Sequence, residues 1–443
     1  MAKRSEETIY AVSSGAGKAG VAVIRVSGGA AGLALETLCG GLPPDRRAVV
    51  RSIRTRNGEI IDRGLVLWMP GPGTFTGEDS AEFQVHGSRA VVSAVLEALQ
   101  EIDGLRPADA GEFARRAFEN GKLDLTEVEG LADLIDAETE AQRRQALRQM
   151  EGAAGRIVED WRGRLIGILA LCEAGIDFAD EDDVPAGVAV EVGPKITALA
   201  TEIDRYLADG HRGEMIRDGL TVVIAGAPNV GKSSLMNALA RRDVAIVSDI
   251  PGTTRDMIEV RLDLSGVPVT VVDTAGLRDS ADLIEQEGVR RAEARARDSD
   301  LVLWMTDTAS ENPPEGLVGP ETWIVRNKCD RTGYPLGPRT GSEYGLSVRS
   351  GDGIEDLLAG LSAWIGDRVG SGTTPLITRA RHRLELEAAV SALHAAANGD
   401  YLVHGDLVAE DLRRAAMALG RITGRIDVED VLDAVFGQFC IGK

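Results

Sequence analysis

Long apolar runs are absent from this chain of 443 residues, and no uncharged stretch reaches the length needed to cross a membrane. The opening MAKRSEETIY lacks the apolar segment of a secretory signal, so we expect a cytoplasmic protein with no membrane partner. Cysteine is also scarce. The four cysteines are too scattered for a zinc-finger spacing and argue against a disulfide framework: Cys39, Cys172, Cys329 and Cys440.

Basic residues are in short supply too, since 49 lysines and arginines face 70 aspartates and glutamates and give a net charge of −21. This charge favours solubility and argues against a surface that coats nucleic acid generally, so any contact with RNA must be local. The length predicts two to four domains, with ample residues for buried cores.

The most informative stretch runs from Leu220 to Asn237, where a short apolar run meets a glycine-rich turn and then a helical pattern. The turn spells GxxxxGKS from Gly226 to Ser233, which is typical of a phosphate-binding loop between a strand and a helix. Lys232 can reach the β- and γ-phosphates, and the Ser233 hydroxyl can ligate Mg²⁺. The predicted nucleotide contacts in this loop are Gly226, Asn229, Val230, Gly231, Lys232, Ser233 and Ser234.

A second motif, DTAG, directly follows the apolar strand pattern VPVTVVDT. Asp273 can hold the Mg²⁺ through water, and the Gly276 amide can contact the γ-phosphate. We expect nucleotide contacts from all four residues of the motif: Asp273, Thr274, Ala275 and Gly276.

A third motif, NKCD, ends the strand pattern TWIVRNKCD and selects the base. The Asp330 carboxylate can accept from the ring N–H and the amino group of guanine, and adenine lacks both donors. The sequence therefore predicts GTP rather than ATP. The contacts expected here are Asn327, Lys328 and Asp330, with weaker contacts from the loop of Ser347, Val348 and Arg349.

Residues 244–256 are expected to be the switch segment, with Thr254 completing the Mg²⁺ shell. Ser248, Thr253 and Thr254 are the predicted nucleotide contacts of this segment. Leu277 follows DTAG where many GTPases place a glutamine that orients the attacking water, and leucine cannot do this. Glu285 and Glu287 are the nearest alternatives for that role. Arg255 is a candidate for an arginine finger within the chain.

Fold class follows from the hydrophobic patterns. Residues 1–118 are expected to be α+β, with strand patterns in TIYAVSS, GVAVIRVSG, RGLVLWMP and SAEFQVHG and helices in GAAGLALETL and SRAVVSAVLEALQEI. The GAGKAG segment at 15–20 is interpreted as a turn, because its spacing is wrong for a dinucleotide loop and a strand pattern follows.

Long helical patterns from 119 to 215 and again from 371 to 443 flank a Ras-like α/β P-loop GTPase domain at 216–370. The last helices are too few to bury a core alone, so we expect them to pack on the earlier ones, with the GTPase inserted. Segments 210–219 and 366–375 are predicted linkers. Thr126 and Glu129 are predicted to form a capping box at the first helix.

Three further stretches resemble one family: FTGEDSAEFQVHG at 75–87, GEFARRAFENGKLDLTEVEGLADLIDA at 111–137, and a final FCIGK. With the GTPase motifs, the whole chain resembles the bacterial tRNA-modification GTPases called MnmE or TrmE. The sequence departs from the family pattern in GKAG, in DAGE and at Pro251.

The resemblance implies a folate-binding, dimerising N-terminal domain, a helical domain and a potassium-dependent GTPase. With a flavin-dependent (FAD) partner subunit, such proteins add aminomethyl or carboxymethylaminomethyl groups to carbon 5 of the wobble uridine of tRNA. The carbon comes from a tetrahydrofolate derivative, 5-formyl- or 5,10-methylene-tetrahydrofolate. The resemblance assigns potassium to Asn229, Ser248, Ile250 and Thr253, water orientation to Glu285, and folate contacts to Arg25, Glu82, Lys122 and Lys443.

The tail residue Cys440 has two interpretations. An apolar Phe-Cys-Ile run is expected to fold against the N-terminal domain of its own or a partner protomer, where Cys440 is either a nucleophile beside the folate or a packed, inert thiol. Two other functions also stay open at this point: a regulatory GTPase switch in ribosome assembly, and a folate-dependent one-carbon transferase with the GTPase as a passenger.

Overall fold

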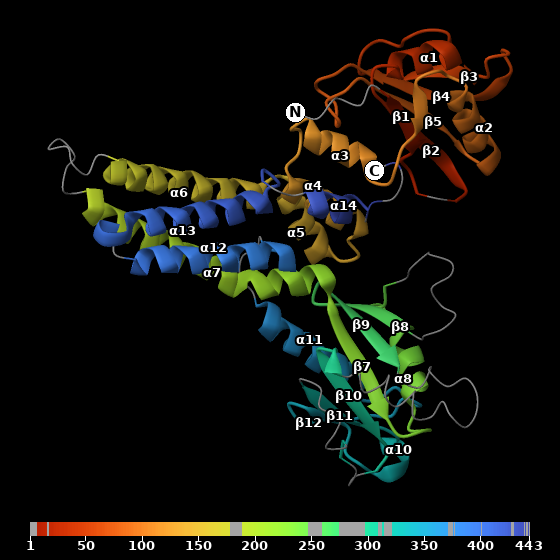
Figure 1. The fold of residues 1–443 in the computed structure, drawn as a ribbon. Helices are drawn as coiled ribbons and strands as arrows, with labels where there is room; N and C mark the ends of the chain where they lie inside the picture. Colours follow the sequence, from red (N-terminus) through yellow and green to blue (C-terminus); the bar gives the residue numbers. More distant parts are fainter. Residues whose placement is uncertain are drawn as a thin grey trace, which may run out of the picture. The chain divides into compact units, whose positions relative to one another are not determined.

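The computed structural model forms two compact units, each discontinuous in sequence (Figure 1). Unit 1 comprises residues 1–132, 149–166 and 416–443, and unit 2 comprises 133–148 and 167–415. The structure describes residues 7–15, 17–177, 188–246, 259–273, 297–308, 312–313, 321–370, 375, 377–399, 401–426, 429–437, 439 and 442. The four-part division at 118, 215 and 370 is finer than these two units and stays a prediction.

Unit 1 contains a six-stranded sheet with strand order β3-β4-β5-β2-β1-β6. Its strands are β1 (Thr8–Val12), β2 (Ala19–Ser27), β3 (Val49–Arg54), β4 (Ile60–Met69), β5 (Ser80–Gly87) and β6 (Leu105–Pro107). All neighbours are antiparallel except β1 and β6. The four predicted strands are confirmed as β1, β2, β4 and β5, and β2 already begins at Ala19, within the segment 15–20 that was predicted to be a turn.

The two faces of this sheet carry different side chains. Alternate residues such as Ile24, Val26 and Phe83 point to one face, where α1 (Ala31–Cys39) and α2 (Arg89–Gln100) cover them. Both helices are confirmed predictions, and α2 begins after Ser88, whose hydroxyl accepts from the Val91 amide. The residues between these apolar ones, including Arg25 and Glu82, are left for the opposite face.

Helices of unit 1 close around an aromatic cluster. They are α3 (Glu112–Glu119), α4 (Leu125–Asp136) and α14 (Glu429–Phe436). Phe118, Leu125 and Val128 pack there with Phe436 and Phe439, so the last helix and the start of the tail share a core with residues about 300 positions earlier.

The capping box at α4 lies two residues before its predicted position. The Asp124 carboxylate accepts from the Glu127 amide at 2.9 Å, and the Glu127 carboxylate accepts from the Asp124 amide at 2.7 Å. Thr126 is inside the helix and donates to Asp124. The Thr126–Glu129 prediction is therefore wrong; the same spacing recurs at Asp124–Glu127, and only the true start of the helix distinguishes the two pairs.

Unit 2 contains a seven-stranded sheet with strand order β12-β13-β11-β10-β7-β9-β8. Its strands are β7 (Leu220–Gly226), β8 (Glu259–Leu264), β9 (Val267–Asp273), β10 (Leu301–Thr306), β11 (Thr322–Arg326), β12 (Gly337–Thr340) and β13 (Glu343–Gly345). The five strands from β13 to β9 are parallel, and the two edge strands, β12 and β8, are antiparallel. Helices α8 (Lys232–Leu239) and α11 (Ile354–Val369) pack against one face.

Long helices make up the rest of the chain: α5 (Glu140–Met150), α6 (Ala153–Asp177), α7 (Val188–Asp218), α12 (Ala380–Asn398) and α13 (Tyr401–Ile422). Within unit 2, α12 lies along α7 (Figure 1), and Arg383 bonds to Glu214 at 3.0 Å. Because α7 precedes the seven-stranded sheet and α12 follows it, the insertion of the GTPase into a helical domain is confirmed. Among the described residues, none of these helices has the length and apolarity to span a bilayer.

The predicted linker at 210–219 is helical instead, because residues 210–218 continue α7. The predicted linker at 366–375 begins inside α11, which extends to Val369, and its residues 371–374 lie outside the described residues. Gly213 lies so close to the chain that a β-carbon there would overlap the Ile377 carbonyl oxygen. The glycines that suggested a flexible linker therefore allow close packing within unit 2.

Candidate nucleotide and folate sites

Residues with positive φ determine the backbone path of the phosphate loop between β7 and α8. Gly226 and Gly231 have φ values of 143° and 107°, and a β-carbon at Gly226 would overlap the Met305 carbonyl oxygen. Asn229 also has a positive φ of 62°, which asparagine tolerates better than most residues. The loop leads directly into the N-terminus of α8, where free backbone amides favour an anion.

Lys232 and Ser233 lie at the first turn of α8. The Lys232 side chain is 7% exposed, and its Nζ donates to the carbonyl oxygens of Gly226 and Ala227, both at 2.9 Å. Ser233 Oγ donates to Asp273 Oδ2 at 2.8 Å. Parallel pairing of β7 with β9 brings the DTAG aspartate to this point, opposite Ile224 in the register.

The Ser233 hydroxyl and the Asp273 carboxylate form an oxygen donor set that suits a hard divalent cation. Within the part of the chain that the structure describes, no cluster of three His, Cys, Asp or Glu residues could hold a metal by itself. A magnesium ion at this point therefore needs phosphate oxygens and water to complete its shell, as in phosphoryl-transfer enzymes.

The base-selecting motif is built across two loops. Asp330 Oδ1 accepts from Ser347 Oγ at 2.8 Å. Asn327 Nδ2 donates to the Val230 carbonyl at 2.7 Å, while its Oδ1 accepts from the Val348 amide at 3.0 Å. Buried Asn327 thus joins the phosphate loop to the loop of Ser347 and Val348.

Lys328 ties the same motif to the phosphate loop from the other side. Its Nζ donates to the Asn229 carbonyl at 2.9 Å and pairs with Asp307 at 2.7 Å. The sequence-predicted contacts from β7, β11 and the 347–349 loop therefore converge on one place.

A cavity of about 540 Å³ lies at this convergence. The sequence-based prediction included nine of its lining residues and missed four others: Asn237, Ala238, Arg241 and Arg331. The first three follow Ser234 at helical spacing, at the third, fourth and seventh positions, so one face of α8 and its continuation forms the wall. That periodicity was a usable signal in the sequence.

Ten predicted site residues lie outside the described residues: Ser248, Ile250, Thr253, Thr254, Thr274, Ala275, Gly276, Glu285, Cys440 and Lys443. Arg255, Leu277 and Glu287 also lie outside them. Their roles stay predictions.

Arg25 and Glu82 meet on the sheet of unit 1. They are direct cross-strand partners on β2 and β5, and their side chains form an ion pair at 3.1 Å. The Arg25 guanidinium lies 5.7 Å from the ring centre of Phe75 and 5.9 Å from that of Phe113. A cation, a carboxylate and two aromatic rings therefore gather on the face that α1 and α2 leave free.

The third predicted folate contact, Lys122, follows α3. Its Nζ donates to the Pro72 carbonyl at 2.8 Å. Pro72 belongs to the loop of residues 70–79, which we name the β4–β5 loop and which also carries Phe75. Lys122 therefore contacts the same loop, and no contact joins it to Arg25 or Glu82 among the described residues.

The tail also reaches this domain. Ser13 donates to the Gly442 carbonyl at 2.8 Å, and a β-carbon at Gly442 would overlap the Val12 carbonyl oxygen. On β1, Ala11 lies directly opposite Arg25. The prediction that the tail folds onto the N-terminal domain is confirmed at Gly442, within the same chain.

Comparison with known proteins covers nearly the whole sequence. The family described as GTP-binding protein TrmE N-terminus matches residues 8–122, and the MnmE helical domain matches residues 125–440. The tRNA modification GTPase MnmE of Rhodopseudomonas palustris is 52% identical over 444 residues, covering 99% of each chain. The protein of the same name from Parvibaculum lavamentivorans is 54% identical over 445 residues, covering 99% of this chain and 100% of its own. The chain belongs to the MnmE family of tRNA modification GTPases.

Membership of the MnmE family agrees with both sites. The N-terminal match contains Arg25, Glu82 and Lys122, and the helical match spans the inserted sheet of unit 2. Among solved structures, the G domain of the T. maritima FeoB iron transporter is 22% identical to a part of this chain. It covers 33% of this chain and 98% of its own, with a TM-score of 0.24.

Proposed function

We propose that this member of the tRNA modification GTPases is a cytoplasmic, potassium-dependent GTP hydrolase that works as a homodimer with a flavin-dependent partner subunit carrying FAD. Together they would add aminomethyl or carboxymethylaminomethyl groups to carbon 5 of the tRNA wobble uridine, using a tetrahydrofolate carbon. The single observation that supports the hydrolase most directly is the Ser233–Asp273 hydrogen bond beside Lys232 and the base cavity.

Each residue of the nucleotide site has a task in this proposal. GTP, when bound with Mg²⁺, supplies the γ-phosphoryl group that water attacks. Lys232 places a cation beside the phosphates, Ser233 and Asp273 hold the Mg²⁺ by oxygen, and Asp330 accepts from guanine. Thr254 would complete the Mg²⁺ shell, and the amide of Gly276 would contact the γ-phosphate.

Potassium would take the place of an arginine finger, bound by Asn229 and by oxygens of Ser248, Ile250 and Thr253. An arginine finger contributes roughly 10³ to 10⁵ in rate, so GTP turnover should be fast in KCl and slow in NaCl at equal ionic strength. Equal rates in the two salts would contradict the potassium site.

Glu285 is our choice for orienting the attacking water. Glu285→Ala should leave GTP affinity unchanged and lower turnover by about 10² or more. Glu287→Ala is the matched control and should keep most of the activity. If the two variants exchange these outcomes, the role belongs to Glu287.

Folate would bind on the free face of the unit 1 sheet, with Arg25, Glu82, Lys122 and Lys443 as contacts. The ion pair of Arg25 with Glu82 between two aromatic rings supports this assignment, because a pterin is a flat ring with hydrogen-bonding edges. Calorimetry with 5-formyl-tetrahydrofolate should detect binding that Arg25→Ala weakens. Trp68 would be a poor fluorescent reporter, since its ring packs against α1 on the other face.

The modification itself is tested in cells. Mass analysis of tRNA nucleosides from a deletion strain should show loss of the modified wobble uridines, and normal levels would remove the proposal. Re-expression of Cys440→Ser then separates the two roles of Cys440. A nucleophile requires modification to fail while GTP hydrolysis and folding persist, whereas a packed thiol allows normal modification.

A further inference from the structure

Two aromatic rings from different elements lie beside Arg25 at the candidate folate site, one exposed (Phe75) and one fully buried (Phe113). Phe75 lies on the β4–β5 loop, and Phe113 lies in the first turn of α3. Arg25 is within 6 Å of both ring centres, so the positions of the loop and the helix together fix the environment of its guanidinium. A loop needs specific anchors to hold a side chain to this accuracy.

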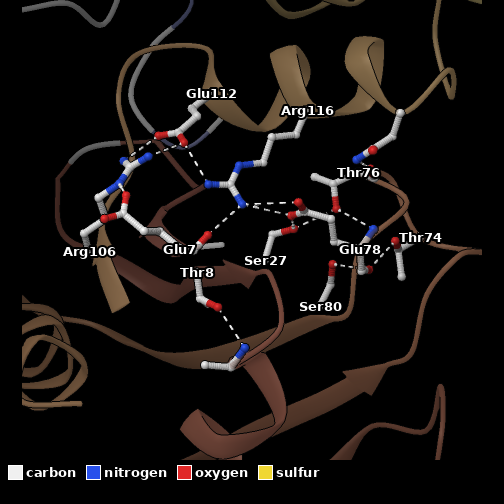
Figure 2. A network of polar contacts seen from close by, with 12 residues as sticks. Glu7, Thr8, Ser27, Thr74, Thr76, Glu78, Ser80, Arg106, Glu112 and Arg116 are labelled. Atoms are coloured by element: carbon white, nitrogen blue, oxygen red, sulfur yellow. Dashed lines mark hydrogen bonds and ion pairs between the residues drawn. The ribbon is translucent and has the colours of Figure 1, made fainter. Parts of the chain in front are cut away.

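One buried arginine connects the β4–β5 loop to α3. Arg116 of α3 is 4% exposed and pairs with Glu78 of the β4–β5 loop at 3.1 Å and with Glu112 of α3 at 2.9 Å. Figure 2 shows its guanidinium between the two carboxylates. Ser27 of β2 donates to Glu78 at 2.8 Å, so the loop is attached to the sheet at the same carboxylate.

Further hydrogen bonds brace the loop around this carboxylate. Thr76 bonds to Ser27 at 2.7 Å, and Thr74 donates to the Glu78 carbonyl at 2.6 Å. Asn120, after α3, donates to the Thr76 carbonyl at 2.7 Å. Three residues of the loop, Thr74, Thr76 and Glu78, are thus hydrogen-bonded to the sheet, to α3 and the residue after it, or to one another. Phe75 itself is 37% exposed.

We propose that Arg116 and Glu78 are positioning residues, whose ion pair holds the β4–β5 loop against α3 so that the exposed ring of Phe75 lies where a folate ring can bind beside Arg25. The inference rests on the folate binding of the proposed function. Arg116 acts through the loop and the helix and does not touch the ligand.

Energetics favour a positioning role over a purely stabilising one. Removing two charges from water is costly, and apolar residues of similar volume often give equal or greater stability than a buried ion pair. The N–H groups of a guanidinium point in fixed directions, however. A carboxylate that moves out of line with them loses charge-assisted hydrogen bonds, which are strong in a low-dielectric setting. The pair therefore restricts the loop to one arrangement more effectively than apolar packing would.

Two substitutions at Glu78 test this in the full chain, with 5-formyl-tetrahydrofolate as the calorimetric probe. Glu78→Ala removes the acceptor for Arg116 and Ser27, and we expect affinity to fall about tenfold or more. Glu78→Gln keeps an acceptor oxygen of the same reach, and we expect affinity within about threefold of the wild type. Hydrogen exchange of the Gly77 and Glu78 amides, measured without ligand, should accelerate in Glu78→Ala and change little in Glu78→Gln.

Val95→Ala provides the matched control. Val95 is a fully buried residue of α2, which packs on the opposite face of the sheet, so this variant destabilises unit 1 without touching the β4–β5 loop. We expect unchanged folate affinity and unchanged exchange in the loop.

Each of the other possible results contradicts a specific part of the proposal. Unchanged affinity in Glu78→Ala refutes positioning, and equal losses in Glu78→Ala and Glu78→Gln would mean that the carboxylate charge acts on the ligand directly. A loss in Val95→Ala as large as in Glu78→Ala would make the effect one of general stability. If the wild type binds no folate, the proposed function fails, and the exchange experiment alone decides whether Arg116 and Glu78 anchor the loop.

Discussion

At the scale of single residues, we expect the choice of base to depend on one carboxylate. Asp330 stands at the start of the short helix α10 (Cys329–Thr332), and Ser347 holds one of its oxygens at 2.8 Å. Lys328, just before it, has a positive φ of 61°, and this turn directs the motif toward the cavity. Two hydrogen bonds to an ionised acceptor contribute far more to discrimination than apolar fit can.

Asp330→Asn should reverse the base preference. The amide can no longer accept both guanine donors, so GTP affinity should fall by about 10² or more, since each hydrogen bond to a charged group contributes about 1.5 to 3 kcal/mol. The new NH₂ group can donate to the carbonyl of xanthine, so XTP should become the better ligand. Competition binding measures this, and retained GTP preference would contradict the assignment. Ser347→Ala, which keeps the carboxylate, should have a smaller effect.

Glu112 is a second residue with a measurable signature. Burial alone raises the pKa of this carboxyl, but hydrogen bonds from Arg106, the Asp109 amide and Arg116 outweigh burial and hold the pKa below its usual value of 4.5. A carboxyl with a lower pKa in the folded state stabilises the fold above the unfolded pKa. That stability is lost as the pH falls through the folded pKa.

We therefore expect the free energy of unfolding to fall more steeply below about pH 4.5 in the wild type than in Glu112→Gln. At pH 7 the variant should be less stable by about 1 to 3 kcal/mol, because buried donors lose a charged acceptor. Denaturant titrations from pH 7 to pH 3 measure both. Glu7→Gln, which removes the 63% exposed partner of Arg106, should cost little at any pH. Parallel curves for the wild type and Glu112→Gln would refute the pKa argument.

At the scale of elements, α7 shows that a glycine within a helix can be required for close packing. Gly213 allows the helix to approach Ile377, whereas the exposed Gly167 of α6 has no atom within 4 Å of where a β-carbon would be. Gly213→Ala should destabilise unit 2 by about 1 to 3 kcal/mol through overpacking. Gly167→Ala should stabilise it by about 0.5 to 1 kcal/mol through helix propensity. Thermal unfolding of the two variants measures the contrast, and equal effects would contradict the close contact.

The same helix shows why part of the fold could not be predicted. Strands with long apolar patterns, such as β7 and β9, were correct because the pattern is local. β6 has only three residues, and β3 reads VVRSIR without clear alternation, so both depend on pairing with distant strands. The linker prediction at 210–218 failed for the same reason, since the contact with Ile377 is made by a segment far away in sequence.

The sites divide in the same way. Lys232 and Ser233 were predictable because the phosphate loop is one local turn with fixed spacing. The Arg25–Glu82 pair was predicted only from the family motif, because the sequence of neither strand alone indicates that these two residues are cross-strand partners. Phe75 and Phe113 were missed because their meeting at Arg25 depends on how α3 and the β4–β5 loop fold onto the sheet.

At the scale of the whole molecule, the two ends of the chain meet. Gly442 has a positive φ of 101° and lies against Val12, so Gly442→Ala combines backbone strain with overlap. The tail should leave β1, and folate affinity should fall while GTP hydrolysis in unit 2 stays unchanged. Ser13→Ala, which removes only the hydrogen bond to Gly442, should give a smaller loss. Calorimetry measures both variants, and full folate affinity in Gly442→Ala would place the tail outside the site.

The aromatic cluster of unit 1 has a consequence for biosynthesis. Phe118 and Leu125 leave the ribosome long before Phe436 and Phe439, which complete their core. At about 5 to 20 residues per second, the roughly 300 intervening residues take about 15 to 60 s to translate. During that interval the nascent N-terminal part exposes the apolar surface that Phe436 and Phe439 later cover. We therefore expect chaperones to bind this surface during translation, and a protein truncated before Phe436 to aggregate.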